Sequence, residues 1–165
     1  MVVDDAALRA LAEGVGEALL AVGLKLVTAE SCTGGWIAKA VTDIPGSSAW
    51  FERGFVTYTN EAKVDLLGVS PDTLARFGAV SEQTVAEMVA GALDRSRAEV
   101  GVAVSGIAGP TGGTPDKPVG TVWIAWKRVG GLTRTELFGF SGDREAVRRQ
   151  AVFQALGMIA DVAGV

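Results

Sequence analysis

A short apolar run in the first fifth of the chain ends abruptly in hydroxyl side chains and two glycines. The run Leu24–Ala29 leads into Glu30-Ser31-Cys32-Thr33-Gly34-Gly35, and the helix-like segment Trp36–Val41 follows. This order predicts a strand, a tight turn and a helix, with Ser31 at the turn. In α/β sheets, ligands bind at the turn that follows the carboxyl end of a strand. The stretch therefore predicts both an α/β fold and the place of a functional site.

The turn admits several kinds of chemistry. Gly34 and Gly35 allow main-chain N–H groups to approach an anion, and the start of a helix adds partial positive charge. Ser31 there is a candidate nucleophile, with nearby N–H groups holding the oxyanion. It is equally a candidate phosphate-binding hydroxyl or a helix cap. Cys32 competes as a nucleophile, and its other interpretation is a small side chain packed under the turn.

Apolar periodicity and turn residues divide the rest of the chain. We expect Asp4 or Asp5 to cap the first helix, Asn60 to cap a short helix in the middle of the chain, and Asp143 to cap the last helix. Gly130-Gly131 is expected to form a hairpin turn. Helices before a late hairpin predict one α/β domain over residues 1–165, with a mixed sheet covered on both faces. Besides those named above, we expect helices over 5–22, 61–67, 71–77, 80–97 and 144–160, and strands over 50–59, 100–104, 119–129 and 132–140.

Composition narrows the classes of function. A net charge of −4 gives no electrostatic case for binding nucleic acid. No apolar stretch approaches the roughly 20 residues of a membrane span, and the start of the chain lacks the basic residues of a secretory signal. A single cysteine, Cys32, excludes an internal disulfide. We therefore expect a cytoplasmic protein that binds neither membranes nor nucleic acid.

The chain has no histidine. That absence excludes every Ser-His or Cys-His relay and argues against a zinc site, so we expect no metal and no cofactor. A nucleophile in this chain must be activated by lysine, tyrosine, a carboxylate, the main chain or a helix terminus.

A second loop of the same kind follows the predicted strand 100–104. It runs from Ser105 to Pro115 and carries four glycines, but it lacks the spacing and the Lys-Ser/Thr end of a P-loop. If the two strands are neighbours, both loops meet at one edge of the sheet and form a crevice. Arg144, Arg148 and Arg149 begin the last helix, where they either form a solvated face or supply one side chain that meets a phosphate.

Tyr58 and Lys63 flank a third junction between a strand and a helix. Positive charge is disfavoured in the first turn of a helix, and this position together with burial would lower the pKa of Lys63. A neutral lysine can take the proton of a serine hydroxyl, and a tyrosine can relay one. The competing interpretation is a solvated lysine paired with Glu61 or Asp65, beside a tyrosine packed on the sheet.

These segments resemble one family. The stretches Ala29–Gly35, Gly54–Lys63 and Gly106–Pro110 with Lys117–Val122 resemble the CinA C-terminal domain family over about residues 6–160. The resemblance implies a three-layer α/β/α sandwich, usually dimeric, that hydrolyses the carboxamide of nicotinamide mononucleotide to nicotinate mononucleotide and ammonia. Longer members carry a further N-terminal domain, and this chain is expected to begin at the amidohydrolase domain.

The resemblance also implies site residues. Ser31 would be the nucleophile, and Lys63 with Tyr58 would activate it. Thr33 and the adjacent N–H groups would line the oxyanion site, and the second loop with Arg144 would hold the ribose phosphate. Position 105 is often threonine in the family, and Ser105 keeps the hydroxyl. The residues expected to contact the substrate are Thr33, Gly34, Gly35, Ser105, Gly106, Gly109, Gly112 and Arg144.

Two other functions stay open on the sequence. A non-catalytic domain that binds or senses pyridine nucleotides would use the same glycine loops without a basic lysine. A purely structural module would have no pocket at the strand ends. For the dimer surface, the candidates are Trp50-Phe51 and the apolar last helix.

Overall fold

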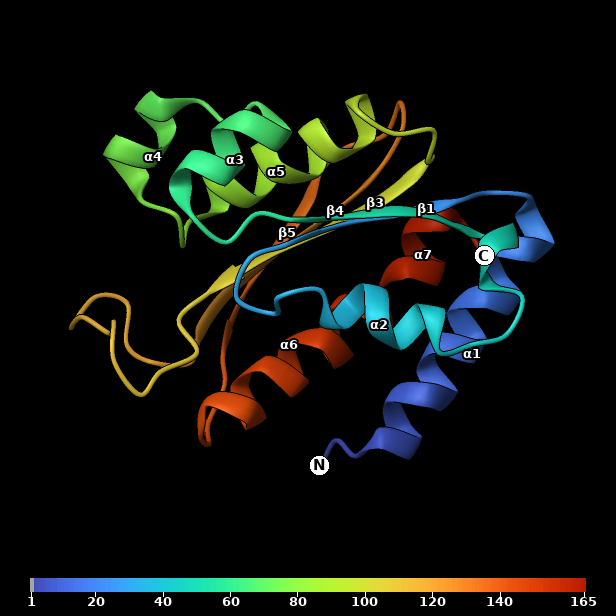
Figure 1. The fold of residues 1–165 in the computed structure, drawn as a ribbon, viewed down its shortest axis with the longest axis horizontal. Coiled ribbons are helices and arrows are strands. Elements are labelled where there is room, and N and C mark those ends of the chain that lie inside the picture. The colour runs from blue at the N-terminus through green and yellow to red at the C-terminus, as the bar shows by residue number, and fades with distance from the viewer. Residues whose placement is uncertain (1) are drawn as a thin grey trace.

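Five strands form one mixed sheet in the order β2-β1-β3-β4-β5. The computed structural model describes residues 2–165, and Figure 1 shows the sheet between two layers of helices. Strands β1, β2 and β3 run parallel, whereas β4 and β5 run antiparallel to their neighbours. The bounds are β1 Leu26–Glu30, β2 Phe51–Val56, β3 Val100–Gly106, β4 Thr121–Arg128 and β5 Arg134–Gly139.

Helices cover both faces, as the sequence predicts. One face carries α1 (Asp5–Val22), α2 (Trp36–Thr42), α6 (Arg144–Gly157) and α7 (Ile159–Ala163) (Figure 1). The other carries α3 (Asn60–Leu67), α4 (Pro71–Phe77) and α5 (Glu82–Asp94). A separate buried apolar cluster lies on each face of the sheet, so the three-layer α/β/α sandwich with a mixed sheet is confirmed.

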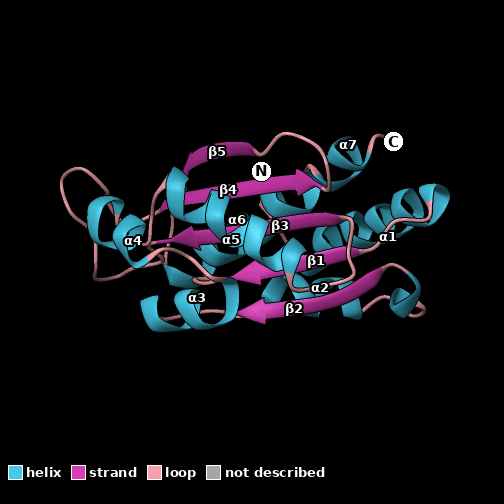
Figure 2. Ribbon diagram, turned by 90° about the horizontal axis from the view of Figure 1, so that it is seen from above, coloured by secondary structure: helices cyan, strands magenta, loops and turns pink. Residues whose placement is uncertain are grey.

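The connections around β1 create a crevice at its carboxyl end. The chain leaves β1 through α2 on one face to reach β2, and returns from β2 through α3, α4 and α5 on the other face to reach β3. Connections that leave neighbouring strands on opposite faces leave a gap outside the strand ends. Figure 2 shows β1, β2 and β3 ending at the same edge of the sheet. The Ser31 N–H donates to the Val104 carbonyl at 3.0 Å, so the predicted meeting of the two loops is confirmed.

Helix caps agree with the sequence at both ends of the chain. The Asp4 carboxylate accepts from the Ala7 N–H, and the Asp143 carboxylate accepts from the Ala146 N–H. Gly23 ends α1 in the left-handed conformation, at φ 67°, where a Cβ would be strained.

The structure corrects the predicted ends of two elements, one helix cap and the last helix. Strand β2 ends at Val56 rather than at residue 59, because the chain turns there toward the cap of α3. The cap is Thr59 and not Asn60, since the Thr59 hydroxyl accepts from the Ala62 N–H in the first turn of α3. Helix α5 ends at Asp94 rather than 97. The predicted final helix is two helices, α6 and α7, separated at Met158, whose N–H donates to the Leu156 carbonyl two residues earlier.

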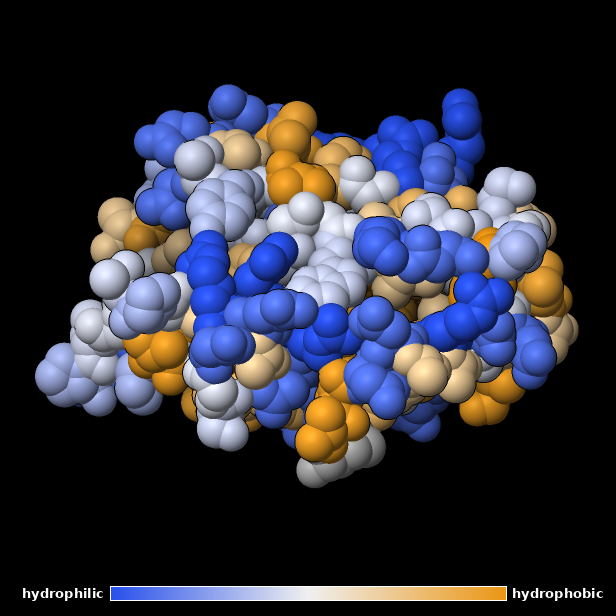
Figure 3. All heavy atoms as spheres, turned by 60° about the horizontal axis from the view of Figure 1, so that its bottom comes forward, coloured by the Kyte–Doolittle hydropathy of each residue, from blue (hydrophilic) through white to orange (hydrophobic). Residues whose placement is uncertain are grey.

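Trp50 does not belong to a surface. Its ring is 2% exposed and packs against Gly16 of α1 so closely that a Cβ on Gly16 would lie 2.7 Å from it. The expectation that Trp50 lies at a dimer surface is therefore wrong. The face that carries α2 and α6 is hydrophilic over much of its middle, with apolar side chains in small groups (Figure 3). Within residues 2–165, no helix is long and apolar enough to cross a bilayer.

Candidate active site

Ser31 and Lys63 are in direct contact. The Lys63 ammonium lies 2.9 Å from the Ser31 Oγ and donates also to the main-chain carbonyls of Thr57 at 2.7 Å and Tyr58 at 3.2 Å. Ser31 follows β1, and Lys63 lies on α3, 32 residues later. The fold thus joins two of the side chains that the sequence selected separately.

Lys63 is wholly buried, at 0% exposure. No carboxylate of residues 2–165 pairs with it, so the expected ion pair with Glu61 or Asp65 is wrong. Burial disfavours the charged amine and lowers the pKa of Lys63 to about 8. Roughly one tenth of the amine is therefore neutral at pH 7, and the neutral form is the one that a general base requires.

A cavity of about 330 Å³ opens in front of Ser31. Both loops, the start of α6 and the connection before α5 line it, so the purely structural module without a pocket is ruled out. Seven of the predicted residues line this cavity: Ser31, Tyr58, Ser105, Gly106, Gly109, Gly112 and Arg144. Cys32 and three further residues of the second loop, Ile107, Ala108 and Thr111, also line it. Ala79 and Val80, before α5, line it as well, and the sequence did not select them.

Arg144 and Tyr58 meet at this cavity. The Arg144 guanidinium donates to the Tyr58 hydroxyl at 3.0 Å and to the Gly109 carbonyl at 2.7 Å. The Tyr58 side chain is 58% exposed rather than packed on the sheet. Its hydroxyl faces Arg144, whereas its main-chain carbonyl faces Lys63 and, at 3.5 Å, the Ser31 hydroxyl.

Ser105 lies on the floor of the cavity with its hydroxyl already engaged. The hydroxyl donates to the Ala79 carbonyl at 2.8 Å, and the side chain is 1% exposed. Ser105 thereby fixes the connection before α5 against the second loop.

Glu30 connects the serine turn to the start of α2 through hydrogen bonds. Its carboxylate, wholly buried, accepts from the Thr33 hydroxyl at 2.7 Å and from the N–H groups of Ile37 and Ala38 at the start of α2. Burial raises the pKa of the Glu30 carboxyl, and these hydrogen bonds oppose the rise. The Thr33 hydroxyl is thus directed at Glu30 and is absent from the cavity lining.

Gly34 and Gly35 shape the turn without lining the cavity. Their φ angles of 60° and 99° are left-handed, and the Gly34 N–H closes the turn by donating to the Ser31 carbonyl. The N–H groups of Cys32 and Thr33 donate to no other residue among residues 2–165. The Gly35 N–H likewise has no acceptor among these residues, and of the three residues Cys32 alone lines the cavity.

Cys32 is packed rather than reactive. Burial raises the pKa of its thiol to about 12, so the thiol stays protonated at neutral pH. The geometry favours Ser31 as the nucleophile of the pair.

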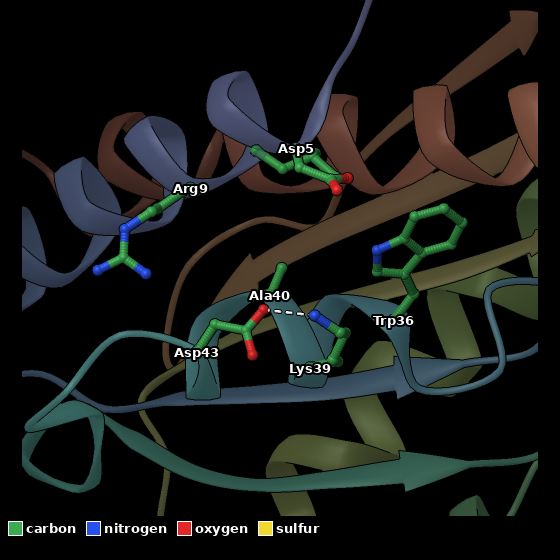
Figure 4. Close-up of a pocket in the computed structure, with 7 residues that line it drawn as sticks. Asp5, Arg9, Trp36, Lys39, Ala40 and Asp43 are labelled. Atoms are coloured by element: carbon green, nitrogen blue, oxygen red, sulfur yellow. Dashed lines mark hydrogen bonds and ion pairs between the residues drawn. The ribbon is translucent and has the colours of Figure 1, made fainter.

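A second cavity, of about 250 Å³, lies between α1 and α2, away from Ser31 (Figure 4). Lys39 and Asp43 form an ion pair at its edge, and the Trp36 ring lies beside it. None of the predicted site residues lines it.

Arg148 contacts the serine turn, although the sequence favoured a solvated position for it. It is half-buried, and its guanidinium donates to the main-chain carbonyls of Cys32 and Thr33. The signal was its spacing of four from Arg144, which places both side chains on one face of α6.

Comparisons with known proteins agree with this geometry. A family model described as the CinA C-terminal domain matches residues 8–163. The chain belongs to the CinA C-terminal domain family.

Similar CinA-family proteins cover nearly the whole chain. The nicotinamide-nucleotide amidohydrolase PncC of Escherichia coli K12 is 61% identical over 92% of both chains. The protein of the same name from Pseudomonas putida is 55% identical over 88% of this chain and 91% of its own. The crystal structure of the competence/damage inducible protein CihA of Agrobacterium tumefaciens superposes with a TM-score of 0.93 at 48% identity, over 94% of this chain and 95% of that one.

Proposed function

We propose that this protein is an amidohydrolase that converts nicotinamide mononucleotide to nicotinate mononucleotide and ammonia. The contact of 2.9 Å between the Lys63 amine and the Ser31 hydroxyl, in a buried setting beside a cavity, carries the proposal. The names of the similar proteins from Escherichia coli and Pseudomonas putida support the substrate.

The proposed reaction has two halves. Neutral Lys63 takes the proton of the Ser31 hydroxyl while Oγ forms a bond to the carboxamide carbon, and the N–H groups of Cys32 and Thr33 hold the oxyanion. The C–N bond then breaks, and the proton passes from Lys63 to the leaving nitrogen, which departs as ammonia. Lys63 next takes a proton from water, whose oxygen attacks the ester, and the released Ser31 oxygen regains its proton.

The other residues take supporting parts in this proposal. Tyr58 holds Lys63 through its main-chain carbonyl and meets Arg144 through its hydroxyl. Arg144, at the edge of the cavity, offers a guanidinium to the phosphate of the nucleotide. Gly106, Gly109 and Gly112 let the second loop approach the substrate closely.

Ammonia release from nicotinamide mononucleotide tests the proposal. We expect Ser31→Ala to lower kcat by about 10³-fold or more, and Lys63→Met by about 10²–10⁴-fold, with both variants folded by circular dichroism. Lys39→Met is the matched control, because Lys39 is exposed and pairs only with Asp43. Wild-type rates in Ser31→Ala or Lys63→Met would refute the mechanism. Protection of the protein against heat by the nucleotide, without ammonia release, would instead indicate a non-catalytic binding domain.

We also propose a cytoplasmic homodimer, as the family resemblance implies. Light scattering on the purified protein tests the dimer, and a mass of one chain at micromolar concentration would contradict it.

A further inference from the structure

Arg148 reaches from α6 to the backbone of the serine turn. Its Nε donates to the Cys32 carbonyl at 2.9 Å, and its Nη2 donates to the Thr33 carbonyl at 3.2 Å. A Cβ built on Gly34 would lie 3.4 Å from Nη2, so the guanidinium lies directly against the turn. The Trp36 ring, 5.5 Å from the Arg148 guanidinium carbon, supports the side chain from beside it.

One of these two carbonyls belongs to a peptide group whose N–H the turn leaves free; the Thr33 carbonyl shares its peptide with the Gly34 N–H, which donates to the Ser31 carbonyl. The Cys32 carbonyl shares its planar peptide with the Thr33 N–H, and the two bonds point in opposite directions. A donor that fixes the carbonyl therefore fixes the direction of the N–H on the other edge. The Thr33 N–H, free of other partners within residues 2–165, is thus aimed away from Arg148.

The charge of Arg148 adds to its geometry. A cationic donor on a carbonyl polarises the whole peptide group and makes its N–H a stronger donor. The planar guanidinium holds both carbonyls at once, which a lysine ammonium cannot do with the same geometry.

We propose that Arg148 is a positioning residue that orients the serine turn so that its free N–H groups can hold the oxyanion. The inference rests on the proposed function, in which the Ser31 turn carries the nucleophile. Arg148 itself need not touch the substrate, since it does not line the cavity.

Arg149 provides the matched control. It is the next residue on α6, stacks on the same Trp36 ring at 4.9 Å, and pairs with Asp5 and Glu145. It makes no hydrogen bond to the serine turn within the described chain. Arg149→Met therefore removes a charge and a contact with Trp36 while leaving the turn in place.

The test compares Arg148→Met, Arg148→Lys and Arg149→Met in two assays. The first is ammonia release from nicotinamide mononucleotide. The second is acetylation of Ser31 by p-nitrophenyl acetate, in which Oγ forms the ester bond and p-nitrophenolate leaves, with mass spectrometry to locate the acetyl group. We expect Arg148→Met to lower kcat and the acetylation rate by about 10–10²-fold, less than removal of an oxyanion donor, with KM within about twofold. Arg148→Lys should recover part of the loss, and Arg149→Met should match the wild type.

The outcomes separate this inference from the proposed function. If the unchanged protein is acetylated at Ser31 but releases no ammonia, the proposed substrate fails and the acetylation rates still decide the role of Arg148. Equal rates in Arg148→Met and Arg149→Met would overturn the inference, as would a loss that appears only in KM. The pH profile of kcat/KM for Arg148→Met gives a further test. An acid limb at the same pH as in the wild type supports action through the turn. A shifted acid limb would mean that the substitution acts by changing the pKa of Lys63, and it would overturn the inference. If the unchanged protein neither releases ammonia from nicotinamide mononucleotide nor is acetylated at Ser31 by p-nitrophenyl acetate, both proposals are overturned.

Discussion

The buried amine of Lys63 predicts how activity depends on pH. With a pKa of about 8, roughly one tenth of Lys63 is neutral at pH 7 and roughly nine tenths at pH 9. Because only the neutral amine can take the Ser31 proton, kcat/KM should rise about tenfold between these pH values. Initial rates of ammonia release measured over pH 6–10 check this expectation.

The same group predicts how stability depends on pH. The pKa of Lys63 is about 8 in the folded chain and near 10.5 when the chain unfolds, so the unfolded chain binds more protons between these values. Stability therefore rises with pH in that window, and the part due to Lys63 should increase by about 2–3 kcal/mol from pH 7 to pH 10. Below pH 8 the charged amine destabilises the fold, since no carboxylate of residues 2–165 pairs with it.

Subtraction of a variant isolates this effect. Urea unfolding of the wild type and of Lys63→Met gives the difference in their free energies of unfolding at pH 7 and again at pH 10. Groups other than Lys63 titrate in both proteins, so their contributions cancel in these differences. We expect the wild type to gain about 2–3 kcal/mol on the variant as the pH rises. A pH-independent difference, together with a flat kcat/KM profile, would show that Lys63 keeps an ordinary pKa and would refute its role as base.

Three further substitutions test the site and the packing. Arg144→Met should raise KM for nicotinamide mononucleotide about tenfold or more with kcat largely kept, because it removes a cationic partner of the phosphate and leaves Ser31 and Lys63 untouched; an unchanged KM in steady-state kinetics would contradict this. Gly91→Ala should lower the free energy of unfolding in urea by about 1–3 kcal/mol, because the new Cβ would lie 1.9 Å from the Leu67 carbonyl oxygen. Gly14→Ala should raise the free energy of unfolding by about 0.5–1 kcal/mol, because the space around Gly14 in α1 is open and alanine favours the helix. Equal effects of the two alanines would show that packing at the end of α3 does not set the cost.

Local patterns were enough to predict the order of elements and the edge where the loops meet. Hydroxyl and glycine residues after an apolar strand mark the end of β1, and the same pattern marks the end of β3. Such patterns depend on neighbours in sequence, which the chain itself displays. Boundaries such as the end of β2 at Val56 depend instead on which hydroxyl captures an N–H, and Thr59 competes there with Asn60.

The burial of Lys63 and the reach of Arg148 required the fold. A lysine between Glu61 and Asp65 has the pattern of a solvated helix face, and only the position of α3 against β1 places its amine inside. Arg148 lies 116 residues from the carbonyl it holds. Contacts at such a separation leave no periodicity in the sequence, so pattern alone favours the solvated interpretation.

The acceptors around Lys63 suit it to the proposed role of base, which histidine takes in other hydrolases. A neutral amine has two N–H bonds and one lone pair. The Thr57 and Tyr58 carbonyls, at 2.7 and 3.2 Å, take the two N–H bonds and leave the lone pair for the Ser31 hydroxyl at 2.9 Å. Both carbonyls are uncharged, so they orient the amine without stabilising its ammonium form as a carboxylate would. Main-chain carbonyls supplied by the turn before α3 thus aim the lone pair of Lys63, and burial keeps enough of the amine uncharged to use it.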